Sequence, residues 1–210
     1  MPDLVYLSLW LCEFNSETML AHWRQAIEAF PASQEAAGVH GVTVYPLNWS
    51  ETPSVEQAFE EGIGADDAVG LVRELLHPDC ACEAQMIWEL WTPKPPDSLD
   101  GREGDWEQKP QVVSILCLGT EFDCESPDDH GHLEINFGPE SNFLPPEEWD
   151  LDPEERQLVM AGPELRENIE TLVHYARRLE RKLPVTRRRL WSESGEELAE
   201  QILSFWKMES

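Results

Sequence analysis

The sequence has 210 residues, 41% of them hydrophobic, and a formal net charge of −27 from 42 acidic and 15 basic side chains. This length and composition suit a globular protein with a substantial hydrophobic core. A negative field of this size repels nucleic-acid phosphates and anionic lipid and attracts cations, so we expect a basic partner and neither nucleic acid nor membrane. Solubility alone and a saline habitat are alternative explanations of the acidity.

The first part of the chain predicts five elements in the order strand, helix, strand, helix, helix. Residues 5–14 and 41–49 are rich in strand-forming residues, and Pro46 in the second suggests an edge or a bulge. Apolar residues recur at helical spacing in 16–30. A short helix is expected at 53–61, where Thr52 can cap and Pro53 suits the first turn, and another at 66–76.

The rest of the chain predicts four strands and two helices. The strongest amphipathic stripe lies at 165–183, and a last helix follows Trp191, where Ser194 and Glu197 form a capping box. Pro-rich polar loops are expected at 93–110 and 139–163. The strands are expected at 80–91, 112–122, 132–138 and 185–191.

Two stretches of the sequence nearly match: LNWSETPSVEQAF at 47–59 and LWSESGEELAEQI at 190–202. Each follows a predicted strand, helix and strand and leads into a helix, over residues 5–61 and 132–206. We interpret these as two copies of a β-α-β-α unit, with chance similarity of a short phrase as the alternative. The fold prediction is a single α+β domain over residues 1–210 with a mixed six-stranded sheet and helices.

The five cysteines stand at 12, 80, 82, 117 and 124, an odd number at irregular spacing. No signal peptide is recognisable at the start, and the apolar stretch 4–12 is too short to span a bilayer. We therefore expect a cytoplasmic protein with reduced thiols and no cofactor. Zinc bound by thiols from several strands is an alternative, but core packing of these cysteines is favoured.

A metal site is the main catalytic alternative. His130 and His132 alternate in a predicted strand, so both rings would share one face, and Asp128 precedes them. The simpler interpretation is an acidic turn entering a strand. The sequence contains no nucleophile elbow, phosphate loop or glycine-rich dinucleotide turn, and His22 or His174 could serve as a general base only beside a suitable carboxylate.

The basic residues concentrate near the end of the chain. Residues 1–155 carry 33 acidic and 5 basic side chains, whereas residues 156–210 carry 9 and 10. One interpretation is a phosphate-binding patch, and the favoured one is an internal counterweight to neighbouring carboxylates. The cluster consists of Arg177, Arg178, Arg181, Lys182, Arg187, Arg188 and Arg189.

Seven of the nine tryptophans, Trp49 among them, fall in predicted strands or helix faces and are expected in the core. Trp106 and Trp149 stand in acidic, Pro-rich loops. The simpler interpretation is that each of these indoles folds back onto its own domain. An indole surrounded by charge also suits a protein-binding surface. We therefore predict a non-enzymatic binding module for a basic protein, as inhibitors and immunity-type proteins are; a metal-dependent enzyme or a self-associating protein are the alternatives. The predicted contacts are Trp106, Trp149, Phe143, Asp105, Glu107, Glu147, Glu148 and Asp150.

Overall fold

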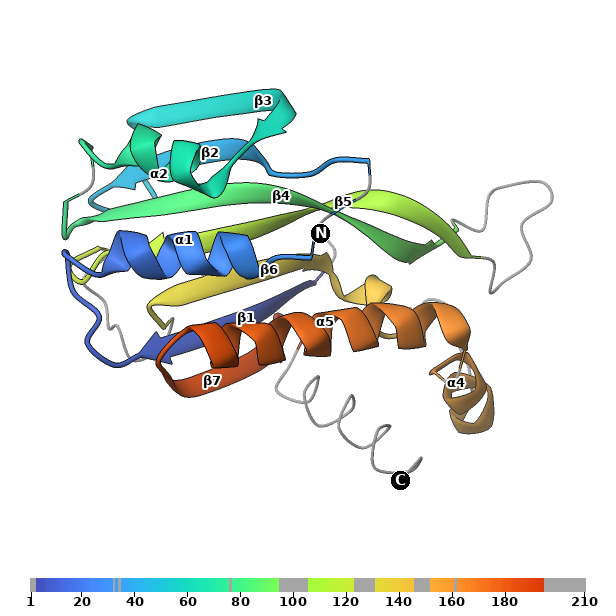
Figure 1. Cartoon of the computed structure of the whole chain (residues 1–210). Helices are drawn as coiled ribbons and strands as arrows, with labels where there is room; N and C mark the ends of the chain where they lie inside the picture. The colour runs from blue at the N-terminus through green and yellow to red at the C-terminus, as the bar shows by residue number, and fades with distance from the viewer. Residues whose placement is uncertain are drawn as a thin grey trace.

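The computed structural model describes residues 3–31, 33, 35–75, 77–94, 106–122, 131–145, 152–160 and 162–194. Seven strands form one sheet in the order β3-β2-β4-β5-β6-β1-β7 (Figure 1). All neighbouring strands are antiparallel. The strands are β1 (Leu4–Leu11), β2 (Val39–Pro46), β3 (Val55–Ile63), β4 (Cys80–Pro93), β5 (Trp106–Leu118), β6 (Leu133–Pro139) and β7 (Val185–Ser192).

Helices cover one face of this sheet. Figure 1 shows α1 and α5 lying side by side in front of the strands, with α2 beside β2 and β3. The stripe predicted at 165–183 forms the 20-residue helix α5, which begins with a proline in its first turn. The helical segments are α1 (Met19–Ala29), α2 (Ala65–Val72), the 3-10 turn η1 (Glu140–Asn142), α4 (Pro153–Met160) and α5 (Pro163–Lys182).

The prediction of an α+β protein is confirmed, but the sheet has seven strands where six were predicted, and it is antiparallel where a mixed sheet was predicted. The parallel strands expected from a β-α-β order do exist, but they are not neighbours. Since β1 pairs antiparallel with both β6 and β7, the strands β6 and β7 run parallel on either side of β1. The connection from β6 through α5 to β7 therefore passes over β1, which is antiparallel to both strands.

The helix predicted at 53–61 is wrong, because these residues form strand β3. Val55, Phe59 and Ile63 are the partly buried positions that pack against the core. Their spacing of four fits a helix face, but it is also even, so it equally fits one face of a strand. The first proposed copy thus has a strand where the repeat requires a helix, and the duplication at 5–61 and 132–206 is not confirmed.

Buried hydrogen bonds from aromatic side chains join α1 to the sheet and α5 to α1. The Trp23 indole of α1 donates a 2.8 Å hydrogen bond to the carbonyl of Ile115 in β5. The Tyr175 hydroxyl of α5 donates to the carbonyl of Ala26, at 3.1 Å. Trp23 and Tyr175 are both fully buried. These hydrogen bonds fix how the helices are oriented in the core, in addition to the apolar packing.

The opposite face of the sheet, here called the polar face, carries the alternate residues of each strand. Glu83 of β4 lies between Thr43 of β2 and Leu116 of β5, and Leu116 in turn lies beside Glu134 of β6. A row of carboxylates and hydroxyls thus crosses the sheet, in contrast to the apolar row that faces the helices. Side chains of the polar face include Tyr6, Ser8, Trp10, Thr43, Tyr45, Glu83, Gln85, Ser114, Leu116, Glu134, Asn136, Arg187, Arg189 and Trp191.

Among the helices of the described ranges, none is long and apolar enough to cross a membrane.

Candidate partner-binding site

A buried carboxylate lies on the polar face near the end of β2. Glu83 is only 8% exposed. Its Oε2 accepts a 2.8 Å hydrogen bond from the Tyr45 hydroxyl, and its Oε1 accepts one of 2.5 Å from Ser114 Oγ. Within the described residues no cation lies within ion-pair distance of it. Neutral donors alone therefore stabilise a charge that is mostly withdrawn from water.

Tyr45 connects this carboxylate to a group of aromatic rings. Its ring centroid lies 5.2 Å from the Trp49 indole, and the indole lies 4.9 Å from Phe122, both in edge-to-face geometry. Burial and the hydrogen bond to Glu83 raise the pKa of Tyr45 to about 12. The phenol therefore remains protonated at neutral pH and keeps donating its proton to the carboxylate.

The turn after β2 presents two apolar side chains to solvent. Leu47 is 53% exposed and Trp49 is 49% exposed. Between them, the Asn48 side chain accepts hydrogen bonds from the backbone N–H and the hydroxyl of Ser50, at 2.9 and 2.6 Å. Such a turn is a defined structure, so both side chains are held outward.

The backbone of this turn is strained at Leu47. Its φ of +62° lies in the left-handed region, which costs a residue with a Cβ about 1–2 kcal/mol. The Leu47 N–H donates a 2.8 Å hydrogen bond to the carbonyl of Asp79, which helps to hold this conformation. Strained backbone conformations cluster at ligand-binding and switch sites, so this turn is a candidate contact site.

We call the residues Tyr45, Leu47, Trp49, Glu83 and Phe122 the acid–aromatic surface. Exposed leucine and tryptophan side chains can supply apolar contact area, and indole faces attract cations. The neighbouring carboxylate has no ionic partner among the described residues. This combination suits a cationic group carried on an apolar stem, such as an arginine or lysine side chain.

The other end of the polar face has a different character, because arginines of β7 stack on indoles there. The Arg187 guanidinium lies 4.2 Å from the ring centroid of Trp10, and that of Arg189 lies 5.6 Å from Trp191. In the predicted basic cluster, Arg188 alone pairs with a described carboxylate, that of Glu180. Within the described ranges, Arg188 is therefore the one residue of the cluster that pairs with a carboxylate of the chain, as an internal counterweight would.

The structure places three of the predicted partner contacts. Phe143 is fully buried in the core, so its ring is not available to a partner. Trp106 begins β5 half-buried and packs against the core, and the Glu107 carboxylate lies 2.5 Å from the Lys109 ammonium. The loop prediction at 93–110 fails in this part because the strand extends back to residue 106. Asp105, Glu147, Glu148, Trp149 and Asp150 lie outside the described residues.

His132 is the one predicted metal ligand that the structure describes; Asp128 and His130 lie outside the described ranges. The Nδ1 atom of His132 accepts a 2.9 Å hydrogen bond from the backbone N–H of Leu11. The neutral ring then carries its proton on Nε2, so neither nitrogen has a free lone pair for a metal. The described residues contain no group of three His, Cys, Asp or Glu side chains that could hold a metal ion.

Three of the four cysteines in the described ranges pack as small apolar side chains. Cys80, Cys82 and Cys117 are buried, whereas Cys12 is exposed just beyond β1. Cys82 and Cys117 are direct neighbours across β4 and β5, and burial raises the pKa of Cys82 well above its usual value. Deeply buried thiols of this kind are poor nucleophiles.

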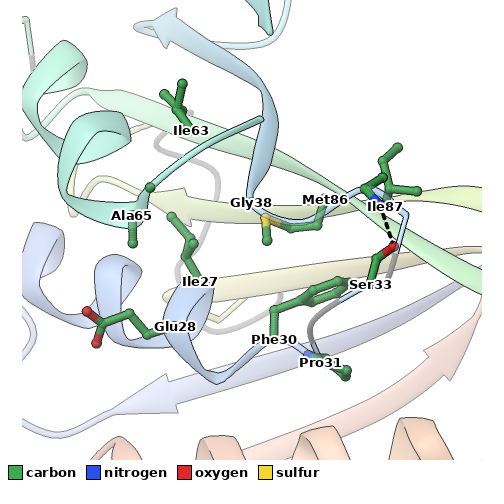
Figure 2. A pocket seen from close by; sticks show the side chains of 12 residues that line it. Ile27, Glu28, Phe30, Pro31, Ser33, Gly38, Ile63, Ala65, Met86 and Ile87 are labelled. Atoms are coloured by element: carbon green, nitrogen blue, oxygen red, sulfur yellow. Dashed lines mark hydrogen bonds between the residues drawn. The ribbon is translucent and has the colours of Figure 1, made fainter. Parts of the chain in front are cut away.

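A pocket of about 190 Å³ lies between the end of α1, the end of β3 and the middle of β4. Figure 2 shows Ile27, Phe30 and Met86 lining it, and its walls are largely apolar. Ligand and cofactor sites are usually larger, at about 300–1,000 Å³, and contain several convergent polar groups. We assign no activity to this pocket.

Comparison with known protein families, with curated proteins and with solved structures found no match for this chain.

The sequence prediction missed the acid–aromatic surface because it placed Trp49 in the core. The indole follows a strand, which suggested burial, but Asn48, Ser50 and Pro53 around it are turn-forming residues. An aromatic residue inside such a turn was the available signal. Nothing in the sequence distinguished Glu83 from the other glutamates before the strand register was known.

Proposed function

We propose that this chain is a non-enzymatic binding module for a basic protein and that the acid–aromatic surface is its contact site. The observation that carries the proposal is the position of the exposed Trp49 indole, joined through Tyr45 to the buried Glu83 carboxylate. The predicted contact region thereby moves from the Pro-rich loops to the turn after β2. The net charge of −27 supports a cationic partner.

Affinity and encounter rate have different physical sources at this surface. Truncation of a hot-spot tryptophan to alanine at a protein interface costs about 2–4 kcal/mol of binding free energy. Long-range attraction between the acidic chain and a basic partner mainly accelerates association. A cation placed beside Glu83 would also compensate a charge that has lost most of its hydration. The proposed site therefore combines an apolar anchor with an electrostatic one.

Binding of a fluorescent peptide of alternating arginine and alanine, followed by anisotropy, tests this proposal. Trp49→Ala should weaken binding about 30-fold, the equivalent of about 2 kcal/mol. The matched control is Leu158→Ala, which removes a 73% exposed apolar side chain from α4. Equal affinities for these two variants would reject the acid–aromatic surface as the binding site.

A second pair of variants separates local from overall electrostatics. Glu83→Gln and Glu154→Gln change the net charge by the same amount, but Glu154 is exposed on α4. We expect Glu83→Gln to weaken peptide binding about tenfold more than Glu154→Gln does. If both reduce binding equally, the peptide responds to overall charge alone.

The metal-dependent alternative receives no support from His132, the one described member of the predicted site, because its Nδ1 lone pair is already engaged by a backbone N–H.

A further inference from the structure

The two edges of the sheet carry opposite charge. Figure 1 shows β3 at one edge and β7 at the other. Glu56, Glu60 and Glu61 are exposed on β3, whose nine residues include no cation. Arg187, Arg188 and Arg189 are exposed on β7, whose eight residues include no anion. An edge strand has backbone N–H and C=O groups available for a further strand.

Most of these charges have no ionic partner within the described part of the chain. No ion pair joins Glu56, Glu60 or Glu61 to a described residue. Arg187 and Arg189 stack on indole rings, which leaves guanidinium N–H groups unpaired with carboxylate. A complementary strand could therefore form ion pairs at either edge without breaking existing ones.

Charge of a single sign on each edge decides which edges can meet. Two β3 strands would bring glutamates together, and two β7 strands would bring arginines together, so both symmetric pairings are disfavoured. Only the pairing of β3 with β7 is complementary. We propose that the occupant of each edge is a second copy of this chain, joined head to tail through β3 of one copy and β7 of the next.

The strand directions define the geometry of this contact. Six antiparallel steps separate β3 from β7, so the two edge strands run in the same direction. A second copy with its helices on the same side would therefore add β3 parallel to β7. Glu56 lies opposite Thr43 on the polar face, the face that also carries Arg187 and Arg189. Such a contact uses different surfaces on the two copies and can extend further.

A bulge restricts the length of strand that can pair. The register of β3 against β2 shifts beyond Ala58, and Gly62 there has a φ of +70°. A Cβ at Gly62 would lie 2.3 Å from the carbonyl oxygen of Ala37, so the bulge requires glycine. Regular pairing is thus available at Val55–Ala58, the stretch that contains Glu56. A short contact of this kind is expected to be reversible.

The net charge sets the conditions for association. Copies that each carry −27 repel one another at long range, but at an ionic strength of about 0.15 M this repulsion is screened beyond about 8 Å. Charges in direct contact across paired edges lie within that distance. Sedimentation velocity at this ionic strength should therefore show concentration-dependent association of the full chain up to about 1 mM.

Complementary charge reversals give the decisive test. One variant carries Glu56→Lys and Glu60→Lys, so both of its edges are basic; the other carries Arg187→Glu and Arg189→Glu, so both of its edges are acidic. Each variant alone should remain monomeric, and their mixture should associate. Glu154→Lys with Glu155→Lys on α4 makes the same charge change away from both edges and should associate as the parent chain does.

Monomeric behaviour of the parent chain and of the mixed variants over the same concentrations would overturn the inference. Circular dichroism establishes that each variant is folded. The inference uses neither Trp49 nor Glu83, so its outcome is independent of the proposed function.

Discussion

The Tyr45 hydroxyl donates a 2.8 Å hydrogen bond to Oε2 of Glu83, and this contact joins the exposed rings of the turn after β2 to the buried carboxylate of β4. The two residues belong to neighbouring strands but are not direct cross-strand partners, since Tyr45 lies opposite Ala81. The length of the phenol ring bridges this offset. The half-exposed Trp49 indole and the buried Glu83 carboxylate are thereby connected through the Tyr45 side chain.

Glu83→Gln should change stability little. The amide keeps the shape of the side chain, can accept from Tyr45 and can donate to Ser114, while the buried charge is removed. The weaker hydrogen bonds and the relieved desolvation oppose each other, so we expect a change in the free energy of unfolding below about 1 kcal/mol. Chemical denaturation measures it. A loss of several kcal/mol would mean that the carboxylate is primarily structural.

The three tyrosines of the chain should titrate late. Burial, followed by interactions with Glu193, raises the pKa of Tyr6 to about 12, and Tyr45 is raised to about 12 by burial and Glu83. Burial also raises the pKa of Tyr175. Near-ultraviolet absorbance should therefore show little phenolate at about pH 10.5 in the folded chain, whereas the denatured chain titrates near pH 10.

The sign of the linked stability follows from these shifts. The folded pKa values are higher than the unfolded ones, so their contribution to stability is complete below about pH 10 and is lost as the pH rises through about 12. A tyrosine of the folded chain that ionises near pH 10 would contradict the burial or the hydrogen bonding described for it.

Asn168 should be essential for the packing of α5 against the sheet. Its side chain accepts from the Trp91 N–H at 3.0 Å and donates to the carbonyls of Trp91 and Asn142 at 2.8 and 2.7 Å. Asn168→Ala leaves the partly buried backbone groups of Trp91 and the buried carbonyl of Asn142 without this partner, which should lower the free energy of unfolding by about 3 kcal/mol.

Asn142→Ala is the matched control for this change. Asn142 is also fully buried, but its side-chain nitrogen and oxygen have no hydrogen-bond partner among the described residues. Its removal should therefore destabilise the chain less than Asn168→Ala, as measured by chemical denaturation. Equal losses would show that cavity formation, rather than the hydrogen bonds, determines the cost.

His22 should make the fold sensitive to acid. Both of its ring nitrogens are buried without a described partner, and burial lowers its pKa below the usual 6.5. As the pH falls, the unfolded chain binds this proton first, so stability is complete above about pH 6.5 and is lost as the pH falls towards the folded pKa. His22→Phe should reduce the loss of stability between about pH 7.5 and about pH 5.

The exposed His174 of α5 provides the comparison for this experiment. His174→Gln should leave the acid sensitivity unchanged in denaturant unfolding at the two pH values. An identical response of the two variants would argue against the buried His22 ring as its source.

The sequence correctly predicted the elements whose pattern of apolar residues fits only one type of secondary structure. The stripe at 165–183 corresponds to α5 (Pro163–Lys182), and the alternation at 80–91 corresponds to β4 (Cys80–Pro93). The pattern at 53–61 fits both a helix and a strand, and pairing with β2 decided for the strand. The periodicity within a segment does not reveal which strands become neighbours in the sheet. The antiparallel arrangement could therefore not be predicted.

The proposed binding surface was harder to predict than the fold. The overall acidity indicated that a proposed partner would be positively charged. It did not indicate which of the many carboxylates becomes buried in the fold. Burial of Glu83 depends on β2, β4 and β5, which meet only in the folded sheet. The sequence analysis therefore predicted the tryptophans of the Pro-rich loops as partner contacts. It assigned Trp49 to the core, although this side chain is half exposed.

A titration of the ¹⁵N-labelled chain with the arginine–alanine peptide, observed at the indole N–H resonances, shows whether Trp49 and Glu83 form the contact site. We expect the Trp49 resonance to shift, to shift far less in Glu83→Gln, and to stay unmoved with a glutamate–alanine peptide. A Trp49 resonance that stays fixed while the peptide binds, or that responds equally to both peptides, would rule out this surface as the site for a cationic partner.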